Sequence, residues 1–571
     1  MSLSSRRVFI VRLVSASAAM AAGGVLSACG GGGDGGDGGG NPPAATPVRF
    51  DYGVASGDPL ADRVVLWTHA TGGADPAVVA LNWEVALDAG FTQVVSSGQT
   101  QAAADAGFTT KVDATGLAPG QTYFFRFRAG SDVSPVGRTR TLPTLGAASV
   151  KLAVFSCANF PAGFFHAYNA ALPAGAEYAV HLGDYIYEYE ATGYASEDAV
   201  ALGRVSLPAT ECLTLADYRQ RYAQYRSDPD LKQLHANLPM IAIWDDHEIA
   251  DNAHATGALN HTEGLEGAYS ARAAAAAQAY HEWLPIRTPD MNNLRRVYRS
   301  FDFGSLLSLH MLETRLLARE PEVTLAALTD PATSATALAT LNAPTRQMLG
   351  AEQMGWLTQQ MTASSATWQV LGQQVLMARM DFPASVLQAL VPANDPADGA
   401  RAVADYLLAR ELAASAPELM TPEQQALVDP VRNPRLGYNM DAWDGYPAAR
   451  ETLLTTASGL GKRLVSLAGD THNAWYSDLT LQDGTKVGEE FAAPAVSSPG
   501  LEAFLDALSP STVADIFTRV LGSLKFTDTE RRGFLLMTFT AQAATGDWYF
   551  VDTVKSSTHT VTLGYTATFS A

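Results

Sequence analysis

Five runs of mostly apolar residues constrain the fold of this chain more than any other feature. They cover residues 151–156, 177–182, 240–244, 368–372 and 463–468. A strand that is buried on both faces has a continuous apolar sequence, whereas a half-buried strand alternates. Ala-rich helical segments, such as 269–283, separate the runs. Buried strands that alternate with helices predict a layered α/β domain.

A different pattern occupies residues 50–144, where short alternating segments are separated by turn signals. Strands are expected at 63–68, 79–85 and 122–127, and Gly57-Asp58-Pro59 is typical of a turn. Regular short strands favour a small antiparallel sandwich of immunoglobulin or fibronectin type. The segment has no cluster of metal-binding or nucleophilic residues, so we expect a structural or substrate-shaping module.

The first 29 residues have the features of an export signal. Arg6 and Arg7 precede an uncharged stretch, Leu13 to Ala28, that is too short and too weakly apolar to span a bilayer. This pattern predicts export by the Tat machinery. The stretch ends in Leu26-Ser27-Ala28-Cys29, which resembles a bacterial lipoprotein box, so we expect a membrane anchor on Cys29 and a periplasmic or cell-surface lipoprotein. The alternative is an ordinary signal peptide with a chance cysteine.

The chain is thus expected to have four parts. A glycine run loses too much backbone entropy to fold, so a Gly- and Pro-rich tether follows the signal. The expected boundaries are 1–29 for the signal with its lipoprotein box, 30–47 for the tether, 48–145 for the all-β domain and 146–571 for the α/β domain, with helical insertions near 320–345 and 395–430.

The charge balance and the cysteine count exclude two classes of protein. The chain has 58 Asp and Glu residues against 38 Lys and Arg residues, a formal charge of −20 at pH 7. A nucleic-acid-binding surface needs clustered cations, so none is expected. Three scattered cysteines cannot form a disulfide framework in a chain of 571 residues. An enzyme or a binding protein rich in carboxylates remains.

Four of the predicted strands end in residue types that bind metal ions. A single Asp after a strand is often a helix cap, but carboxylate, imidazole or thiolate groups at four endings indicate a shared site. The carboxyl ends of strands in an open α/β sheet meet at one crevice, where ligands bind. The endings are Ser156-Cys157-Ala158-Asn159, Gly183-Asp184-Tyr185-Ile186-Tyr187-Glu188, Asp245-Asp246-His247-Glu248 and Gly469-Asp470-Thr471-His472-Asn473.

Two of these residues point to iron. Cys157 and Tyr187 would bind a metal as thiolate and phenolate, whose ordinary pKa values are about 8.5 and 10. Keeping both ionised near neutral pH requires a strongly polarising ion, and Fe(III) fits better than Mg or Ca. Asp184 and His472 are candidates to complete the coordination sphere.

The remaining ligand types indicate a second, harder metal site. Asp246 and Asp470 offer only oxygen, which suits Ca, Mn or Mg. A dinuclear centre bridged by Asp184 is the economical arrangement. Two metals a few ångströms apart polarise a phosphoryl oxygen and activate a water molecule, which best suits in-line displacement at phosphorus.

With these motifs the sequence resembles the PhoD-like alkaline phosphatases, a branch of the metallophosphatases that is related to the purple acid phosphatases. The resemblance covers most of the chain after the tether and includes Gly53 to Pro59 and Asp444-Gly445-Tyr446-Pro447. It implies a metallophosphatase-type β-sandwich flanked by helices. It also implies hydrolysis of phosphate monoesters, diesters or both by a metal-activated hydroxide, without a covalent phospho-enzyme.

The resemblance implies roles for further residues. The Gly-Asn-His-Glu motif of purple acid phosphatases is matched by Asp245 to Glu248, which gives Asp246 the ligand position and makes His247 a phosphate contact or general acid. One His ligand of those enzymes is replaced by Gln374 or its neighbour Gln373, which makes the second site hard enough for calcium. Asn159 either orients phosphate or caps a helix.

The expected substrate is a small-molecule, phospholipid or polymeric phosphoester. Two alternatives stay open: a phospholipase D-like phosphodiesterase at the same site, and a non-catalytic surface-binding lipoprotein that metals only structure. The His-x-Lys chemistry of phospholipase D is excluded, because no histidine has Lys two residues later. A Gly-x-Ser-x-Gly nucleophile elbow and a complete P-loop are absent from the sequence. Arg315 and Arg450 are expected to pack or to lie at the surface rather than to contact phosphate.

Overall fold

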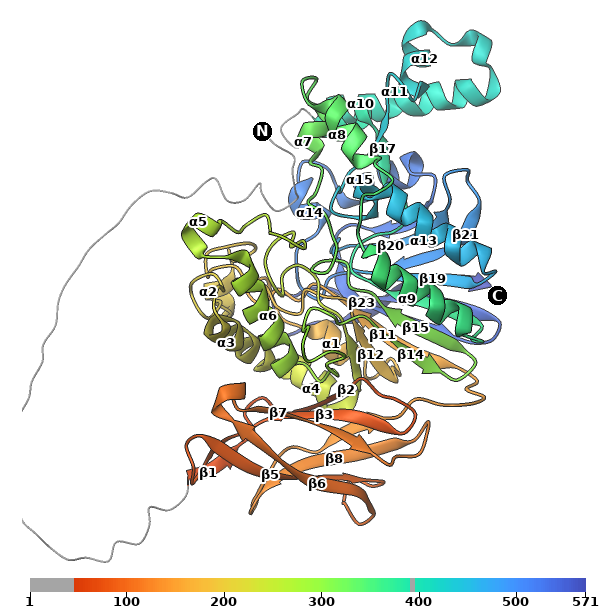
Figure 1. Ribbon diagram of the computed structural model, residues 1–571. Coiled ribbons are helices and arrows are strands. Elements are labelled where there is room, and N and C mark those ends of the chain that lie inside the picture. Colours follow the sequence, from red (N-terminus) through yellow and green to blue (C-terminus); the bar gives the residue numbers. More distant parts are fainter. Residues whose placement is uncertain (1–45, 391–395, 571) are drawn as a thin grey trace, which may run out of the picture.

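The computed structural model describes residues 46–390 and 396–570. The predicted export signal, its Cys29 and most of the predicted tether lie outside the described residues. Two large β-sheets pack together, and helices cover their outer faces (Figure 1). Among the described residues, none of the helices combines the length and the apolar character needed to cross a bilayer.

The first large sheet contains three of the predicted buried strands. Its centre is parallel and runs from β11 through β12 and β13 to β2, and the antiparallel strands β23 and β3 flank this centre. The nine strands in spatial order are β25 (Val561–Ser570), β24 (Ala543–Val551), β23 (Arg532–Phe539), β11 (Val150–Phe155), β12 (Tyr178–His181), β13 (Met240–Ala242), β2 (Val54–Gly57), β3 (Arg63–His69) and β7 (Thr109–Thr115).

The second large sheet contains the other two predicted runs, in β16 and β19. Strands β15, β16, β19 and β21 are parallel, and burial on both faces explains why β16 and β19 have mostly apolar sequences. The seven strands in spatial order are β14 (Arg299–Phe303), β15 (Leu307–Met311), β16 (Trp368–Gly372), β19 (Arg463–Ala468), β21 (Lys486–Ala492), β20 (Ala474–Thr480) and β22 (Leu524–Asp528).

One apolar core fills the space between the sheets. Phe155 and Val180 of the first sheet lie in the same buried cluster as Val370 and Val465 of the second. Helix α6 (Tyr269–Trp283) has the bounds that its Ala-rich sequence predicts. With it, α1 (His166–Ala170), α3 (Leu215–Arg226) and α4 (Pro229–Asn237) cover the first sheet, while α9 (Gly350–Ala363), α13 (Pro447–Gly459) and α15 (Pro510–Val520) cover the second.

Helices occupy the two ranges in which insertions were expected. Helices α11 and α12 form an arm that extends away from the sheets (Figure 1), and Thr421 with Gln424 forms a capping box at the start of α12. The bounds in these ranges are α7 (Leu325–Thr329), α8 (Ser334–Leu341), α11 (Pro396–Ser415) and α12 (Pro422–Val428). Other short elements are α2 (Ala199–Leu202), α5 (Glu263–Glu266), α10 (Ala384–Ala389), α14 (Leu501–Phe504), β17 (Asp381–Pro383) and β18 (Arg435–Gly437).

The N-terminal part is a small β-sandwich, as predicted, but it shares a sheet with the α/β part. Its outer sheet packs on β2, β3 and β7, and Leu66, Val85 and Phe127 form part of the core between them. Met240 of β13 pairs with Gly57 of β2, so these three strands continue the nine-stranded sheet. The outer sheet consists of β10 (Gly137–Arg140), β8 (Thr122–Ala129), β5 (Val78–Ala86), β6 (Val94–Ala103) and β9 (Asp132–Val133), and β1 (Thr46–Arg49) pairs with β4 (Thr71–Gly73).

Asp58, which was expected in a simple turn, links the two parts of the chain. Arg299 of β14 donates to both of its carboxylate oxygens, at 2.6 and 2.8 Å, and the backbone N–H of Arg287 donates at 2.7 Å. Arg299 also donates to the carbonyl of Ala242, the last residue of β13, at 2.8 Å. The ion pair therefore holds β2, β13 and β14 together at the C-terminal end of β13. The segment that contains Asp245 and Asp246 begins shortly after this point.

Candidate metal centre

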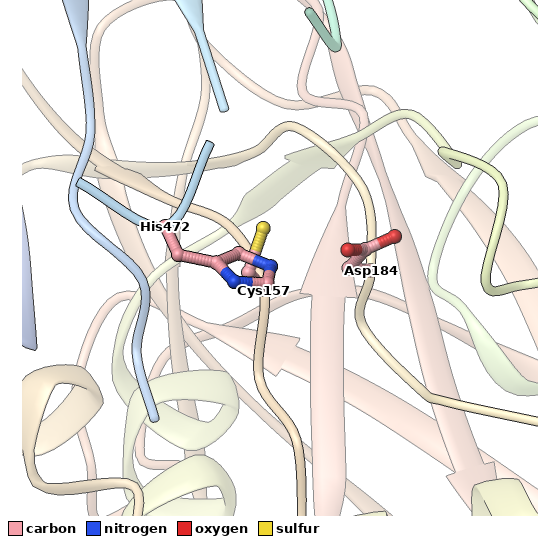
Figure 2. A group of neighbouring side chains, drawn as sticks. All are labelled: Cys157, Asp184 and His472. Carbon is pink, nitrogen blue, oxygen red and sulfur yellow. The ribbon is translucent and has the colours of Figure 1, made fainter. Parts of the chain in front are cut away.

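Segments that follow strands of both large sheets meet at one buried point. Cys157 follows β11 and Asp184 follows β12, both in the first sheet, whereas His472 follows β19 in the second. Figure 2 shows these three side chains converging from separate loops. Backbone bonds join the loops, because the N–H of Cys157 donates to the carbonyl of Gly183 at 3.2 Å and that of Ala495 to the carbonyl of His472 at 3.1 Å. The predicted convergence of strand ends is present in the structure.

Four of the predicted ligands have left-handed backbone conformations. Their φ angles are 59° for Cys157, 54° for Asp184, 61° for Asp470 and 64° for His472. This region is uncommon for residues other than glycine and costs about 1–3 kcal/mol each time, so the surroundings must impose it. Such strain concentrates at functional sites, where it directs side chains to one point.

Two glycines let the loops approach closely enough for these side chains to meet. A Cβ atom on Gly183 would lie 2.3 Å from the Cβ of Asp245, and one on Gly469 would lie 2.6 Å from the Cβ of Ser156. Only glycine fits at both positions. The close approach brings Asp184 beside Asp245 and Asp470 beside Cys157.

The first ligand group contains the four residues predicted to bind iron. One donor atom each from Cys157, Asp184 and His472 lies within 4.8 Å of the others, and all three residues are buried. The hydroxyl of Tyr187 donates to Oδ2 of Asp184 at 2.8 Å and lies 3.2 Å from Nε2 of His472. Burial, with the nearby carboxylates of Asp184 and Asp470, raises the pKa of the Cys157 thiol well above its usual value. A thiolate at this position therefore needs a cation beside it.

The second ligand group is made of carboxylates. Asp245, Asp246 and Asp470 offer oxygens within 4.8 Å of one another, and a third group joins Asp184, Asp246 and His247. Asp184 is thus common to the sulfur-containing group and to a group that contains Asp246, as a bridging ligand requires. Burial raises the pKa of Asp245 well above its usual value, although the guanidinium of Arg315 opposes the shift.

The charges at this point fit bound cations. Arg315 is fully buried and ion-pairs with Asp245, and one of its terminal nitrogens lies 3.6 Å from Asp246 and 3.9 Å from Asp470. Several buried carboxylates against one guanidinium leave excess negative charge, which is expensive in a low-dielectric interior unless cations offset it. The donor set, with thiol, phenol and imidazole on one side and carboxylates on the other, also suits two different metals.

Gln374 is buried, and both its amide oxygen and its amide nitrogen are hydrogen-bonded. Its Oε1 accepts from the hydroxyl of Thr314 at 2.7 Å, and its amide donates to the carbonyls of Trp244 at 2.7 Å and Leu312 at 2.9 Å. It therefore braces the segment that enters Asp245. Gln373 accepts from the indole of Trp443 at 3.1 Å. A ligand role for either glutamine stays a prediction.

The other two predicted site residues, Asn159 and His247, are buried, and His247 belongs to the third of the candidate ligand groups. Asn159 donates from Nδ2 to the carbonyl of Tyr194 at 3.2 Å, and it does not cap α1, which has Phe165 at its N-cap. His247 is fully buried, and its Nδ1 lies 2.6 Å from a carboxylate oxygen of Glu188.

Glu248 supports the loops that carry Asp184 and Asp245. Its carboxylate accepts from the backbone N–H groups of Asp184 at 3.0 Å, Tyr185 at 2.5 Å and Asp245 at 2.8 Å. It thereby joins the loops that follow β12 and β13. Burial raises the pKa of this carboxyl group to about 8.

Sequence reasoning missed Asn439 and Asp441, and it expected Arg315 to pack or to lie at the surface, whereas Arg315 lies among the carboxylates of the site. Arg315 donates to Asp441 at 2.9 Å, and Asn439 donates to Asp470 at 3.3 Å. A signal for Arg315 exists in the sequence, because Glu313-Thr314-Arg315 comes soon after the leucine-rich segment that forms β15 (Leu307–Met311). Asn439 and Asp441 lie in a loop with no such signal.

Comparisons with known proteins show to which family the chain is related. The chain matches the family model of PhoD-like phosphatases over residues 152–548 and the model of the N-terminal domain of PhoD-like phosphatases over residues 39–143. It is 34% identical over 466 residues to alkaline phosphatase D of Bacillus subtilis (strain 168), which covers 79% of this chain and 70% of the relative. A solved structure of PhoD aligns with a TM-score of 0.73 and 29% identity over 91% of this chain and 90% of that one. The predicted family, fold class and enzyme class are confirmed. The chain belongs to the PhoD-like phosphatase family and is a hydrolase that acts on phosphoester bonds.

Proposed function

We propose that this phosphatase depends on a mixed metal centre and hydrolyses phosphate monoesters, diesters or both. Fe(III) would lie beside one or more Ca ions, with Mn or Mg as alternatives at the oxygen-rich position. One observation carries this proposal: a buried group with thiol, phenol and imidazole donors shares Asp184 with the group that contains Asp246 and His247.

The two groups divide the proposed ligands. Cys157, Tyr187 and His472 would hold the iron, and Asp184 would bridge the two metals. Asp246 and Asp470, with Gln374 as a further candidate, would hold the harder ion. When bound, the ions supply Lewis acidity to the phosphoryl group and lower the pKa of water.

The chain's own residues would bind and orient the reacting groups. A ring atom of His247 lies within 4.8 Å of the carboxylates of Asp184 and Asp246, from where it would contact the phosphate or protonate the leaving oxygen. Asn159 would orient the phosphate. Arg315 ion-pairs with Asp245, and Asn439 donates to Asp470, so both keep carboxylates directed toward the centre.

We also propose that the enzyme acts outside the cytoplasm, as a lipoprotein of the periplasm or cell surface. The twin arginines Arg6 and Arg7 and the lipoprotein box that ends in Cys29 support this proposal. Its substrates would then be small-molecule, phospholipid or polymeric phosphoesters.

Metal removal tests the proposed chemistry. The purified protein is treated with chelators and then given Fe(III) and Ca, separately and together, and is assayed on 4-nitrophenyl phosphate, bis(4-nitrophenyl) phosphate and phosphatidylcholine. We expect hydrolysis of a monoester or a diester to disappear with the metals and to return only with both. Full activity after complete metal removal would contradict the proposal.

A further inference from the structure

We infer that Glu188 is a positioning residue that fixes the ring of His247 during phosphoester hydrolysis. The inference rests on the proposed function, in which His247 contacts the phosphate or the leaving oxygen. Glu188 belongs to none of the candidate metal-ligand groups among the described residues. It follows Tyr187 directly in the sequence and so lies at the edge of the centre.

The contact between the two side chains is short and excluded from solvent. Both side chains are fully buried, and 2.6 Å separates Nδ1 of His247 from Oε2 of Glu188. An ionised carboxylate only accepts hydrogen bonds, so the proton of this bond must reside on Nδ1. Nε2 is thereby selected as the ring nitrogen that acts on the phosphate or the leaving group, and it donates a proton when the ring is the imidazolium, which the Glu188 carboxylate stabilises.

Other bonds prevent the Glu188 carboxylate from rotating. Its Oε1 accepts from the backbone N–H of Asp251 at 2.8 Å and from Nδ2 of Asn260 at 2.9 Å. Both oxygens therefore have donors in fixed positions. A carboxylate held in this way fixes the orientation of the His247 ring. Residues that accept a hydrogen bond from a ligand histidine have the same effect in metal sites.

Aromatic rings limit the remaining freedom of the imidazole. The ring of Tyr187 stacks on His247 with centroids 4.2 Å apart and an interplanar angle of 29°, and the ring of Tyr189 lies 5.1 Å away at 55°. Because Tyr187 also donates to Asp184, the plane of the imidazole is tied to the candidate iron site. Glu188 sets the rotation within that plane.

A second carboxylate on the same network provides a matched control. Nδ2 of Asn260 also lies 3.1 Å from Oε1 of Glu211, and Arg272 of α6 donates to that oxygen at 2.6 Å. Glu211 therefore shares Asn260 with Glu188, while the bond to Nδ1 of His247 comes from Glu188. Loss of packing in the network would affect both glutamates, whereas loss of imidazole positioning would affect Glu188 alone.

A double-mutant cycle tests the inference. The metal-loaded enzyme is prepared as wild type, Glu188→Gln, His247→Gln and the double variant, and kcat and KM are measured on aryl and alkyl phosphates. We expect Glu188→Gln to lower kcat/KM by about 10- to 100-fold, mostly in kcat and more for alkyl esters, whose leaving oxygens need a proton. In the His247→Gln background the same change should have no further effect, because Glu188 acts through His247. Glu211→Gln should stay within about threefold of wild type.

Two results would overturn the inference: equal losses from Glu188→Gln in both backgrounds, or equal losses from Glu188→Gln and Glu211→Gln. Should Glu188→Gln not fold, Glu188→Asp takes its place, since it keeps the charge but withdraws the carboxylate by one methylene. Its loss should again vanish in the His247→Gln background, and a persistent loss would overturn the inference. A wild-type protein that retains its metals but hydrolyses no phosphoester would instead refute the proposed function.

Discussion

The ion pair between Asp58 and Arg299 allows a prediction whose size follows from the structure. The side chains are 1% and 10% exposed, and two bonds of 2.8 and 2.6 Å join them. Arg299→Met keeps most of the side-chain volume but removes both bonds and the one to the carbonyl of Ala242. Because Asp58 is then a buried charge without its partner, we expect the free energy of unfolding to fall by about 3–5 kcal/mol.

An exposed pair on the same domain gives the control. Arg63 and Asp62 lie 3.0 Å apart, but their side chains are 38% and 58% exposed. Arg63→Met should therefore change the free energy of unfolding by less than about 1 kcal/mol. Urea unfolding followed by tryptophan fluorescence measures both changes. A loss for Arg299→Met no larger than that for Arg63→Met would refute the claim that this pair joins the two parts of the chain.

Three further predictions concern pH, the membrane and calcium. Burial lowers the pKa of His281 to about 3, so the folded protein keeps this ring neutral, while the unfolded chain takes up a proton below about pH 6.5. The free energy of unfolding should therefore fall as the pH drops below about 6.5, and this group should account for a loss of about 2 kcal/mol at pH 5. His281→Asn should flatten the pH dependence of the urea midpoint. A pH dependence equal to that of the wild type would contradict this. Cys29→Ala should release the protein from the membrane fraction of cells, and retention there would argue against a lipid anchor. Asn439→Ala, which removes the bond to Asp470, should weaken calcium binding about 10- to 100-fold in calorimetric titration, and unchanged affinity would count against the proposed site.

The strands and the core helices could be predicted because their sequence patterns are local. The apolar runs became β11, β12, β13, β16 and β19, and the Ala-rich segment became α6 with the expected bounds. The sharing of a sheet between the two parts could not be predicted. It depends on one pairing, Met240 with Gly57, and on an ion pair between Asp58 and Arg299, which are far apart in the sequence.

The residues of the candidate site that directly follow strands could be predicted from the sequence. Loops that follow the neighbouring parallel strands β11 and β12 converge, and so Cys157 and Asp184 meet. His472 follows β19 of the other sheet and joins them because the two sheets pack together. Residues that reach the site from other segments could not be predicted. Asn439 comes from a loop without a pattern, and the alignment of Glu188 with His247 depends on side-chain rotation, which no sequence spacing reveals.

The metal content of the Cys157→Ser variant tests the central claim most directly. Wild-type protein and variant are purified identically, and iron and calcium per chain are measured by mass spectrometry together with the visible absorption spectrum. We predict that the variant loses iron and its phenolate charge-transfer absorption, because a hydroxyl is a poor substitute for a thiolate ligand. Iron content equal to that of the wild type would contradict the assignment of Cys157 and, with it, the proposed metal centre.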